Sequence, residues 1–150
     1  MSGLVFITGA SSGIGQALAA RYAQAGWRVV LVARRLLALQ DWARAQGLGP
    51  DRCGVYAADV RDEAQLRLAA QACLSDWGVP DVVIANAGIS VGIDLDYAED
   101  LAVLRDLIDT NVIGLAATFQ PFIGPMKRRG SGTLVGVASV ASVRGLPGHA

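Results

Sequence analysis

Three glycines with the spacing Gly-x-x-x-Gly-x-Gly follow the first apolar run of the sequence and open a helical pattern. Gly9 permits a tight turn, Gly13 lets a phosphate approach the backbone, and Gly15 lets the helix pack closely on the preceding strand. The free N–H groups and the positive dipole at a helix start favour an anion. In this strand–turn–helix context the segment predicts a cradle for a dinucleotide pyrophosphate, with a plain tight turn as the alternative. The residues expected to contact the cofactor here are Gly9, Ser11, Ser12, Gly13, Ile14 and Gly15.

Two arginines, Arg34 and Arg35, directly follow the second apolar run. Nucleotide-binding sheets that select NAD place an acidic side chain near this point, where it contacts the ribose hydroxyls. No acidic residue stands beside Ala33, and a guanidinium suits the 2′-phosphate that distinguishes NADP(H) from NAD(H). The alternative is that both arginines are solvated residues opening the next helix, where a cation is unfavourable unless an anion is present. The pair therefore predicts NADP(H) as the cofactor, with NAD(H) less favoured.

Polar residues also follow the third and fourth apolar runs. A carboxylate at Asp59 can accept a hydrogen bond from an adenine amino group, while the side chain of Val60 packs on the ring. The alternative for Asp59, a role in helix capping, is weakened because Asp62 already stands at the capping position. The Asn-Ala-Gly segment after the fourth run suits a backbone passing close beneath a cofactor, although alone it also fits an ordinary turn. The expected contacts are Asp59, Val60, Asn86, Ala87 and Gly88.

Two candidate catalytic residues lie in the second half of the sequence. Asn111 falls inside a helical, largely apolar stretch, although asparagine is a poor residue for a helix interior. It therefore indicates a local bend or a functional polar group, with a satisfied core amide as the alternative. Ser139 follows the fifth apolar run, where its hydroxyl would face the same edge as the glycine turn, or would simply belong to a turn.

These residues must be positioned by strands and helices that alternate along the chain. Asp62 and Gln65 have capping-box spacing, and the last helical stretch is expected to be interrupted or kinked near Pro121 and Pro125. The expected strands are 4–8, 28–33, 53–58, 81–85 and 132–138, and the expected helices are 13–25, 36–46, 62–77 and 101–126.

This alternation predicts an α/β fold, in which an open, doubly wound parallel sheet of the Rossmann type is covered by helices on both faces in three α/β/α layers. Ligands bind such sheets at the carboxyl ends of the strands, where the winding reverses. The loops after the five strands should share this rim, and most of the candidate residues fall in those loops. The fold class therefore agrees with a nucleotide site.

Composition excludes several other classes of protein. The 150 residues are 53% hydrophobic and 17% charged, with 13 basic and 13 acidic residues, which fits one globular domain. The balanced charge argues against a nucleic-acid partner. The apolar runs have strand length, which argues against a membrane span or a signal peptide.

The metal-binding and redox residues are few. Cys53 and Cys73 have neither metal-ligand nor disulfide spacing, which predicts free thiols in a reducing cytoplasm. His149 is the only histidine, so we expect neither a histidine-based metal site nor a Ser-His-Asp triad.

Taken together, these segments resemble the short-chain dehydrogenase/reductase family, in the branch whose turn reads Thr-Gly-x-x-x-Gly-x-Gly. The extended branch has a different glycine spacing, Thr-Gly-x-x-Gly-x-x-Gly. The resemblance runs in order over nearly all of the sequence, and five ordered segments are more specific than any one of them. The matching segments are residues 8–15, 59–60, 86–88, 111–114, and Ser139 with residues 145–147.

The resemblance implies an NADP(H)-dependent oxidoreductase that transfers a hydride between the nicotinamide and a carbonyl or alcohol substrate. It makes Asn111 and Ser139 two members of an Asn-Ser-Tyr-Lys tetrad, in which the tyrosine exchanges a proton with the substrate oxygen and the lysine lowers the tyrosine pKa. Ser139 would hydrogen-bond the substrate carbonyl, and Asn111 would hold a water that relays protons. A homodimer or homotetramer is implied as well.

The sequence departs from the family in one respect, because it contains no Tyr-x-x-x-Lys. The family spacing from Ser139 places the tyrosine about two residues beyond Ala150. We therefore expect residues 1–150 to be an incomplete NADP-binding domain, truncated after its fifth strand and inactive alone, from a protein of roughly 250 residues. If no such tyrosine follows, the alternative is a non-catalytic nucleotide-binding sensor or scaffold. Residues 89–96 and 140–150 would line the substrate pocket and suggest a small apolar carbonyl compound.

Overall fold

The computed structural model describes residues 3–140, in which strands and helices alternate as the sequence predicts. The segment 145–147, His149 and nearly all of the expected substrate wall at 140–150 lie outside the described residues. In chain order the elements are β1 Leu4–Thr8, α1 Gly13–Gln24, β2 Arg28–Ala33, α2 Leu36–Ala45, β3 Cys53–Ala57, α3 Glu63–Asp76, β4 Val82–Ala85, α4 Asp100–Ile108, η1 Asp109–Ile113, α5 Gly114–Arg129 and β5 Thr133–Gly136.

The five strands form one parallel sheet in the order β3-β2-β1-β4-β5. The chain first winds outward from β1 to β3 and then returns to add β4 and β5 on the other side of β1. The winding therefore reverses between β1 and β4, where the rule for such sheets places a ligand. This confirms the predicted doubly wound α/β fold.

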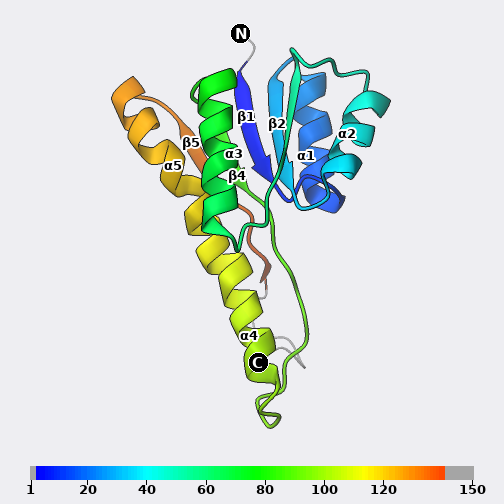
Figure 1. Ribbon diagram of the computed structural model, residues 1–150, viewed down its shortest axis with the longest axis vertical. Helices are drawn as coiled ribbons and strands as arrows, with labels where there is room; N and C mark the ends of the chain where they lie inside the picture. Colours follow the sequence, from blue (N-terminus) through cyan, green and yellow to red (C-terminus); the bar gives the residue numbers. More distant parts are fainter. Residues whose placement is uncertain (1–2, 141–150) are drawn as a thin grey trace.

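Helices cover both faces of the sheet, each over its own apolar core (Figure 1). Strand residues alternate between the two faces, so Val5 and Ile7 pack toward α1 and α2, whereas Leu4 and Phe6 pack toward α3 and α5. The ring of Phe6 lies 4.8 Å, between centroids, from that of Phe122 on α5. Because both faces of β1 and β2 are covered, these strands are almost continuously apolar, which is typical of parallel sheets.

The predicted interruption of the last helical stretch is real but was placed at the wrong residues. α5 runs without a break through Pro121 and Pro125, and the irregular segment is instead a π-helix at Asp109–Ile113. Each proline removes one helical hydrogen bond, but Phe122 and Met126 are buried beside them and hold α5 on the sheet. The helical stretch is therefore irregular around Asn111, where that residue predicts a local bend, and regular at the two prolines.

The fifth strand is shorter than predicted. It covers Thr133–Gly136 rather than residues 132–138, because its partner β4 ends at Ala85, opposite Gly136. One further bond, from the Val137 N–H to the Ala85 carbonyl, continues the pairing at 3.0 Å. The other predicted boundaries agree to within one residue, except that the last helical stretch continues to Arg129 rather than ending at residue 126. Asp62 caps α3 as its spacing indicates.

The segment between β4 and α5 reaches beyond the carboxyl ends of the strands. The chain descends from β4 past the rim of the sheet and returns as α4, which lies below the strands in Figure 1. No residue of α4 is buried, whereas Thr110 in η1 and Gly114 at the start of α5 are. The π-helix thus lies where a buried helix becomes an exposed one, beside the nucleotide rim.

Candidate cofactor site

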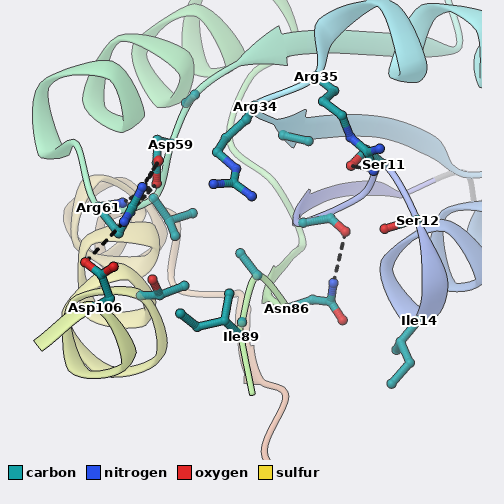
Figure 2. Close-up of a pocket in the computed structure, with 17 residues that line it drawn as sticks. Ser11, Ser12, Ile14, Arg34, Arg35, Asp59, Arg61, Asn86, Ile89 and Asp106 are labelled. Carbon is teal, nitrogen blue, oxygen red and sulfur yellow. Dashed lines mark hydrogen bonds and ion pairs between the residues drawn. The ribbon is translucent and has the colours of Figure 1, made fainter. Parts of the chain in front are cut away.

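A cavity of about 550 Å³ lies along the carboxyl rim, bounded by the loops that follow β1, β2, β3 and β4 (Figure 2). This volume lies within the range of small-molecule sites. All of the predicted cofactor residues line the cavity except Gly13 and Gly15. The predicted residues that line it are Gly9, Ser11, Ser12, Ile14, Arg34, Arg35, Asp59, Val60, Asn86, Ala87 and Gly88.

The glycine turn has the geometry of a phosphate cradle. Gly9 adopts φ +67°, and a Cβ there would lie 2.7 Å from the Cα of Ala87. A Cβ on Gly15 would collide with the Gly9 carbonyl, so this residue serves the close helix packing that its spacing predicts. Gly13, with φ +54°, has open space where a Cβ would stand. Ser12, the N-cap of α1, makes no side-chain capping bond, which leaves the helix-start N–H groups to an anion. The residues of this turn therefore fit the pyrophosphate of a dinucleotide.

Partly buried hydrogen bonds fix the turn to the end of β4. The Thr8 hydroxyl accepts from the N–H groups of Asn86 at 3.2 Å and Ala87 at 3.4 Å, and Thr8 is completely buried. The Asn86 amide donates to the carbonyls of Thr8 at 3.1 Å and Gly9 at 3.3 Å. Asn86 therefore holds the cradle in shape, and the floor of the cavity is pre-formed rather than assembled around a ligand.

The two arginines after β2 have different surroundings. Arg35 is the N-cap residue of α2, and its Nη2 donates to the Ser11 hydroxyl at 3.3 Å, which links the second loop to the glycine turn. Arg34 projects into the cavity between Asp59 and Ser11 (Figure 2). Within residues 3–140 it forms neither an ion pair nor a hydrogen bond through its side chain. Its guanidinium is therefore available to an anionic ligand.

Asp59 is paired with an arginine that the sequence analysis did not single out. Arg61 holds the carboxylate through its Nη2, 2.9 Å from Oδ2, and through its Nε, 3.3 Å from each oxygen. The Arg61 backbone N–H also donates to Oδ1 at 3.0 Å. On the other side Arg61 forms a 3.3 Å ion pair with Asp106 of α4. The hydrogen bonds from Arg61 hold the pKa of Asp59 below its usual range; partial burial opposes this, and the charge of Arg34 adds to it.

Asn111 lies next to the cavity rather than in its wall. Its side-chain oxygen accepts from the Ile89 N–H, and its side-chain nitrogen donates to the Ile89 carbonyl, both at 2.9 Å. The same oxygen would lie 3.2 Å from a Cβ at Gly88. Asn111 thus joins the π-helix to the loop after β4, and its neighbour Thr110 lines the cavity. Ser139 is exposed three residues beyond β5, at the same end of the sheet.

Six lining residues were not among the predicted cofactor contacts. Ile89 continues the Asn-Ala-Gly segment, and the sequence predicts it on the substrate side. Arg61 stands two residues after Asp59, a spacing that permits the observed bonds but does not require them. Asp106 and Thr110 come from helices whose approach to β3 is a tertiary feature without a local sequence pattern. The six residues are Ala33, Ala58, Arg61, Ile89, Asp106 and Thr110.

Comparison with known proteins agrees with this geometry. A family model described as short chain dehydrogenase matches residues 3–150. The chain belongs to the short-chain dehydrogenase/reductase family. This confirms the resemblance drawn from the ordered motifs, and members of the family bind nicotinamide cofactors.

Individual members of the family resemble this chain over most of its length. It is 40% identical over 152 aligned residues to 17-beta-hydroxysteroid dehydrogenase type 1 of Mus musculus, which covers 97% of the chain and 43% of that relative. A short-chain dehydrogenase structure from Streptomyces avermitilis superposes with a TM-score of 0.88 and 34% identity, over 99% of this chain and 53% of that one. A closed form of serine dehydrogenase complexed with NADP⁺ gives a TM-score of 0.88 and 26% identity, over 97% and 57%. The chain therefore spans about half the length of these relatives.

The described residues offer neither a metal centre nor a membrane-spanning helix. Residues 3–140 contain no group of three or more His, Cys, Asp or Glu side chains placed to hold a metal ion. In the same part of the chain, no helix combines the length and the apolar character needed to cross a bilayer.

Proposed function

We propose that this chain is the cofactor-binding part of an NADP(H)-dependent oxidoreductase, which transfers a hydride between the nicotinamide and a carbonyl or alcohol substrate. The observation that carries the proposal is the cavity itself, because it combines an anion-binding glycine turn with an arginine that has no partner among the described residues. The cofactor supplies the hydride chemistry, and the protein supplies binding, orientation and electrostatics.

The choice of NADP(H) over NAD(H) rests on Arg34. An acidic residue at this place would repel a phosphate, whereas the guanidinium of Arg34 can form paired hydrogen bonds with one. Arg35 would add a second positive charge beside the Ser11 hydroxyl. A similar fold has been determined with NADP⁺ bound, in serine dehydrogenase. These observations support NADP(H), although the family as a whole also uses NAD.

The proposed division of labour follows the cavity. The glycine turn, Ser11, Ser12 and Ile14 would hold the pyrophosphate and the adjoining ribose, and Asp59 with Val60 would receive the adenine ring. Asn111 and Ser139 are the proposed catalytic residues, and a Tyr-x-x-x-Lys segment is expected to complete the tetrad in the whole protein. The substrate would be a small carbonyl or alcohol compound, and the whole protein a cytoplasmic homodimer or homotetramer.

The test is to measure cofactor affinity and turnover of the complete gene product. The dissociation constant for NADPH should be lower than that for NADH, and Arg34→Ala should weaken NADPH by about tenfold to a hundredfold while changing NADH little. Arg67→Ala is the matched control, because Arg67 is exposed on α3 outside this cavity. Equal affinities for the two cofactors in the unmodified protein would contradict the NADP(H) assignment. If NADPH binds tightly but is not oxidised in the presence of any carbonyl compound, a non-catalytic nucleotide-binding protein is favoured instead.

A further inference from the structure

Two opposite charges share the adenosine end of the cavity. Arg34 and Asp59 both line it, and in Figure 2 the Arg34 side chain enters between Asp59 on one side and Ser11 on the other. The two groups are close enough for the charge of Arg34 to contribute to the lowered pKa of Asp59. An unpaired carboxylate at this place would attract Arg34 and repel a 2′-phosphate.

The carboxylate of Asp59 is not unpaired, because Arg61 occupies it. The Arg61 side chain meets both oxygens and its backbone N–H meets one, so that most of the acceptor capacity of the carboxylate is directed away from Arg34. A guanidinium that bonds a carboxylate through two nitrogens is held in one orientation. Asp106 fixes the remaining arm of the same guanidinium at 3.3 Å. Arg61 is thus directed toward Asp59 and Asp106 by contacts on both sides.

We propose that Arg61 determines cofactor specificity as a positioning residue. By pairing with the Asp59 carboxylate, it keeps Arg34 available to the 2′-phosphate of NADP(H). This inference rests on the proposed NADP(H) binding and adds a residue that acts on the phosphate without touching it. The pairing of Arg61 with Asp59 strengthens NADP(H) binding in two ways. It removes a competitor for the Arg34 guanidinium, and it offsets a negative charge that would oppose the incoming phosphate dianion. NADH has no 2′-phosphate, so neither effect reaches it.

The test measures the dissociation constants of NADPH and NADH for variants of the complete gene product. Arg61→Ala should raise the constant for NADPH by about fivefold to tenfold and that for NADH by less than about twofold, because only NADPH depends on Arg34. Arg61→Gln, which keeps the length of the side chain but not its charge, should act in the same direction. Arg67→Ala, which removes one arginine from the exposed face of α3, should leave both constants unchanged.

A second substitution separates specificity from structure. Adding Asp59→Asn to Arg61→Ala removes the charge that would capture Arg34, so the preference for NADPH over NADH should return to its original ratio. Asp59→Asn alone should leave that ratio unchanged or raise it, even if both cofactors lose a contact to adenine. The readout is the ratio of the two constants, which a merely structural role would not move.

Several results would overturn the inference. If Arg61→Ala weakens both cofactors equally, Arg61 only supports the loop after β3. If the double variant keeps the lost ratio, the effect of Arg61 does not act through Asp59. The proposed function fails separately, since that failure is seen in the unmodified protein as an absence of NADPH preference before any variant is compared.

Discussion

At the scale of single residues, the type of a polar side chain does not tell whether it holds the backbone in place or is available to a ligand. The side-chain amide of Asn86 hydrogen-bonds to the glycine turn, and that of Asn111 hydrogen-bonds to Ile89. Both are polar residues at a rim where the sequence predicts ligand contacts, and both organise backbone. Arg35 does the same through Ser11, whereas Arg34, identical in type and adjacent in sequence, has no such partner among the described residues. Sequence reasoning could therefore place the rim but could not distribute the roles within it.

Ser139 provides the first prediction at this scale. In the complete gene product, Ser139→Ala should lower kcat by about two orders of magnitude while leaving the dissociation constant of NADPH nearly unchanged. The reason is that a hydroxyl at the carboxyl end of β5 would hydrogen-bond the substrate carbonyl, whereas the cofactor cavity is lined by other residues. Steady-state kinetics with the best carbonyl substrate, together with a fluorescence titration of NADPH, measure the two quantities. Ser139→Thr, which keeps the hydroxyl, should recover part of the rate, and an undiminished kcat in Ser139→Ala would remove this residue from the proposed tetrad.

At the scale of elements, alternating apolar and helical patterns were enough to place the five strands and the first three helices in order, and to predict one interrupted helical stretch where α4, η1 and α5 follow one another. What they missed is how neighbouring elements correct one another. The two prolines predict a break in the last helix. The helix nevertheless stays continuous, because the buried side chains of Phe122 and Met126 hold it on the sheet. The irregular turn forms at Asp109–Ile113 instead, where Asn111 bonds to the loop after β4. Such an outcome depends on tertiary contacts, which override local helix preferences.

The end of α5 provides a prediction about stability. Arg129 donates from Nη1 to the Val79 carbonyl at 2.6 Å and from Nη2 to the carbonyls of Pro80 at 2.7 Å and Ser131 at 3.0 Å. It also forms a 3.3 Å ion pair with Asp81, whose other oxygen accepts from the first N–H of β1. This one side chain therefore joins α5 to the starts of β4 and β1.

Arg129→Ala should lower the free energy of unfolding by about 1.5–3 kcal/mol, because a charged donor to several carbonyls is lost. The neighbouring Arg128 is exposed and forms no ion pair within residues 3–140, so Arg128→Ala should change it by less than about 0.5 kcal/mol. Urea unfolding of the complete gene product, followed by circular dichroism, compares the two variants. Equal midpoints would show that the Arg129 contacts do not hold the helix in place.

At the scale of the whole molecule, the doubly wound sheet explains why residues far apart in sequence meet. Loops after successive parallel strands converge on one rim, so the glycine turn, the arginines, Asp59 and the Asn-Ala-Gly segment could be assigned to one site from their positions after strands alone. Arg61 and Asp106 could not, because their meeting depends on how far α4 extends beyond the rim. The same extension leaves the surface of α4 without a buried residue.

The last prediction concerns the 150-residue chain expressed by itself. β5 is the edge strand of the described sheet, all four of its residues are exposed, and it contains neither charge nor proline. Strands of this kind pair readily with other chains. Large apolar side chains are exposed as well, with Ile108 of α4 at 46%, Val112 of η1 at 53% and Leu134 of β5 itself at 39%. The described part of the chain thus has both an exposed, uncharged edge strand and exposed apolar side chains on its helices.

Burying a fully exposed side chain of this kind stabilises a protein by about 1.5–3 kcal/mol. Each of these side chains is about half exposed, so leaving several of them in water still forfeits a sizeable part of the stability of a typical domain. We therefore expect the isolated chain to be insoluble, or to form a molten, oligomeric species that binds the dye ANS and reduces no carbonyl compound. Light scattering and thermal unfolding of the purified chain test this expectation. A sharp, cooperative transition of a soluble monomer would contradict it, because the exposed edge and helix face would then be compatible with an independently stable domain.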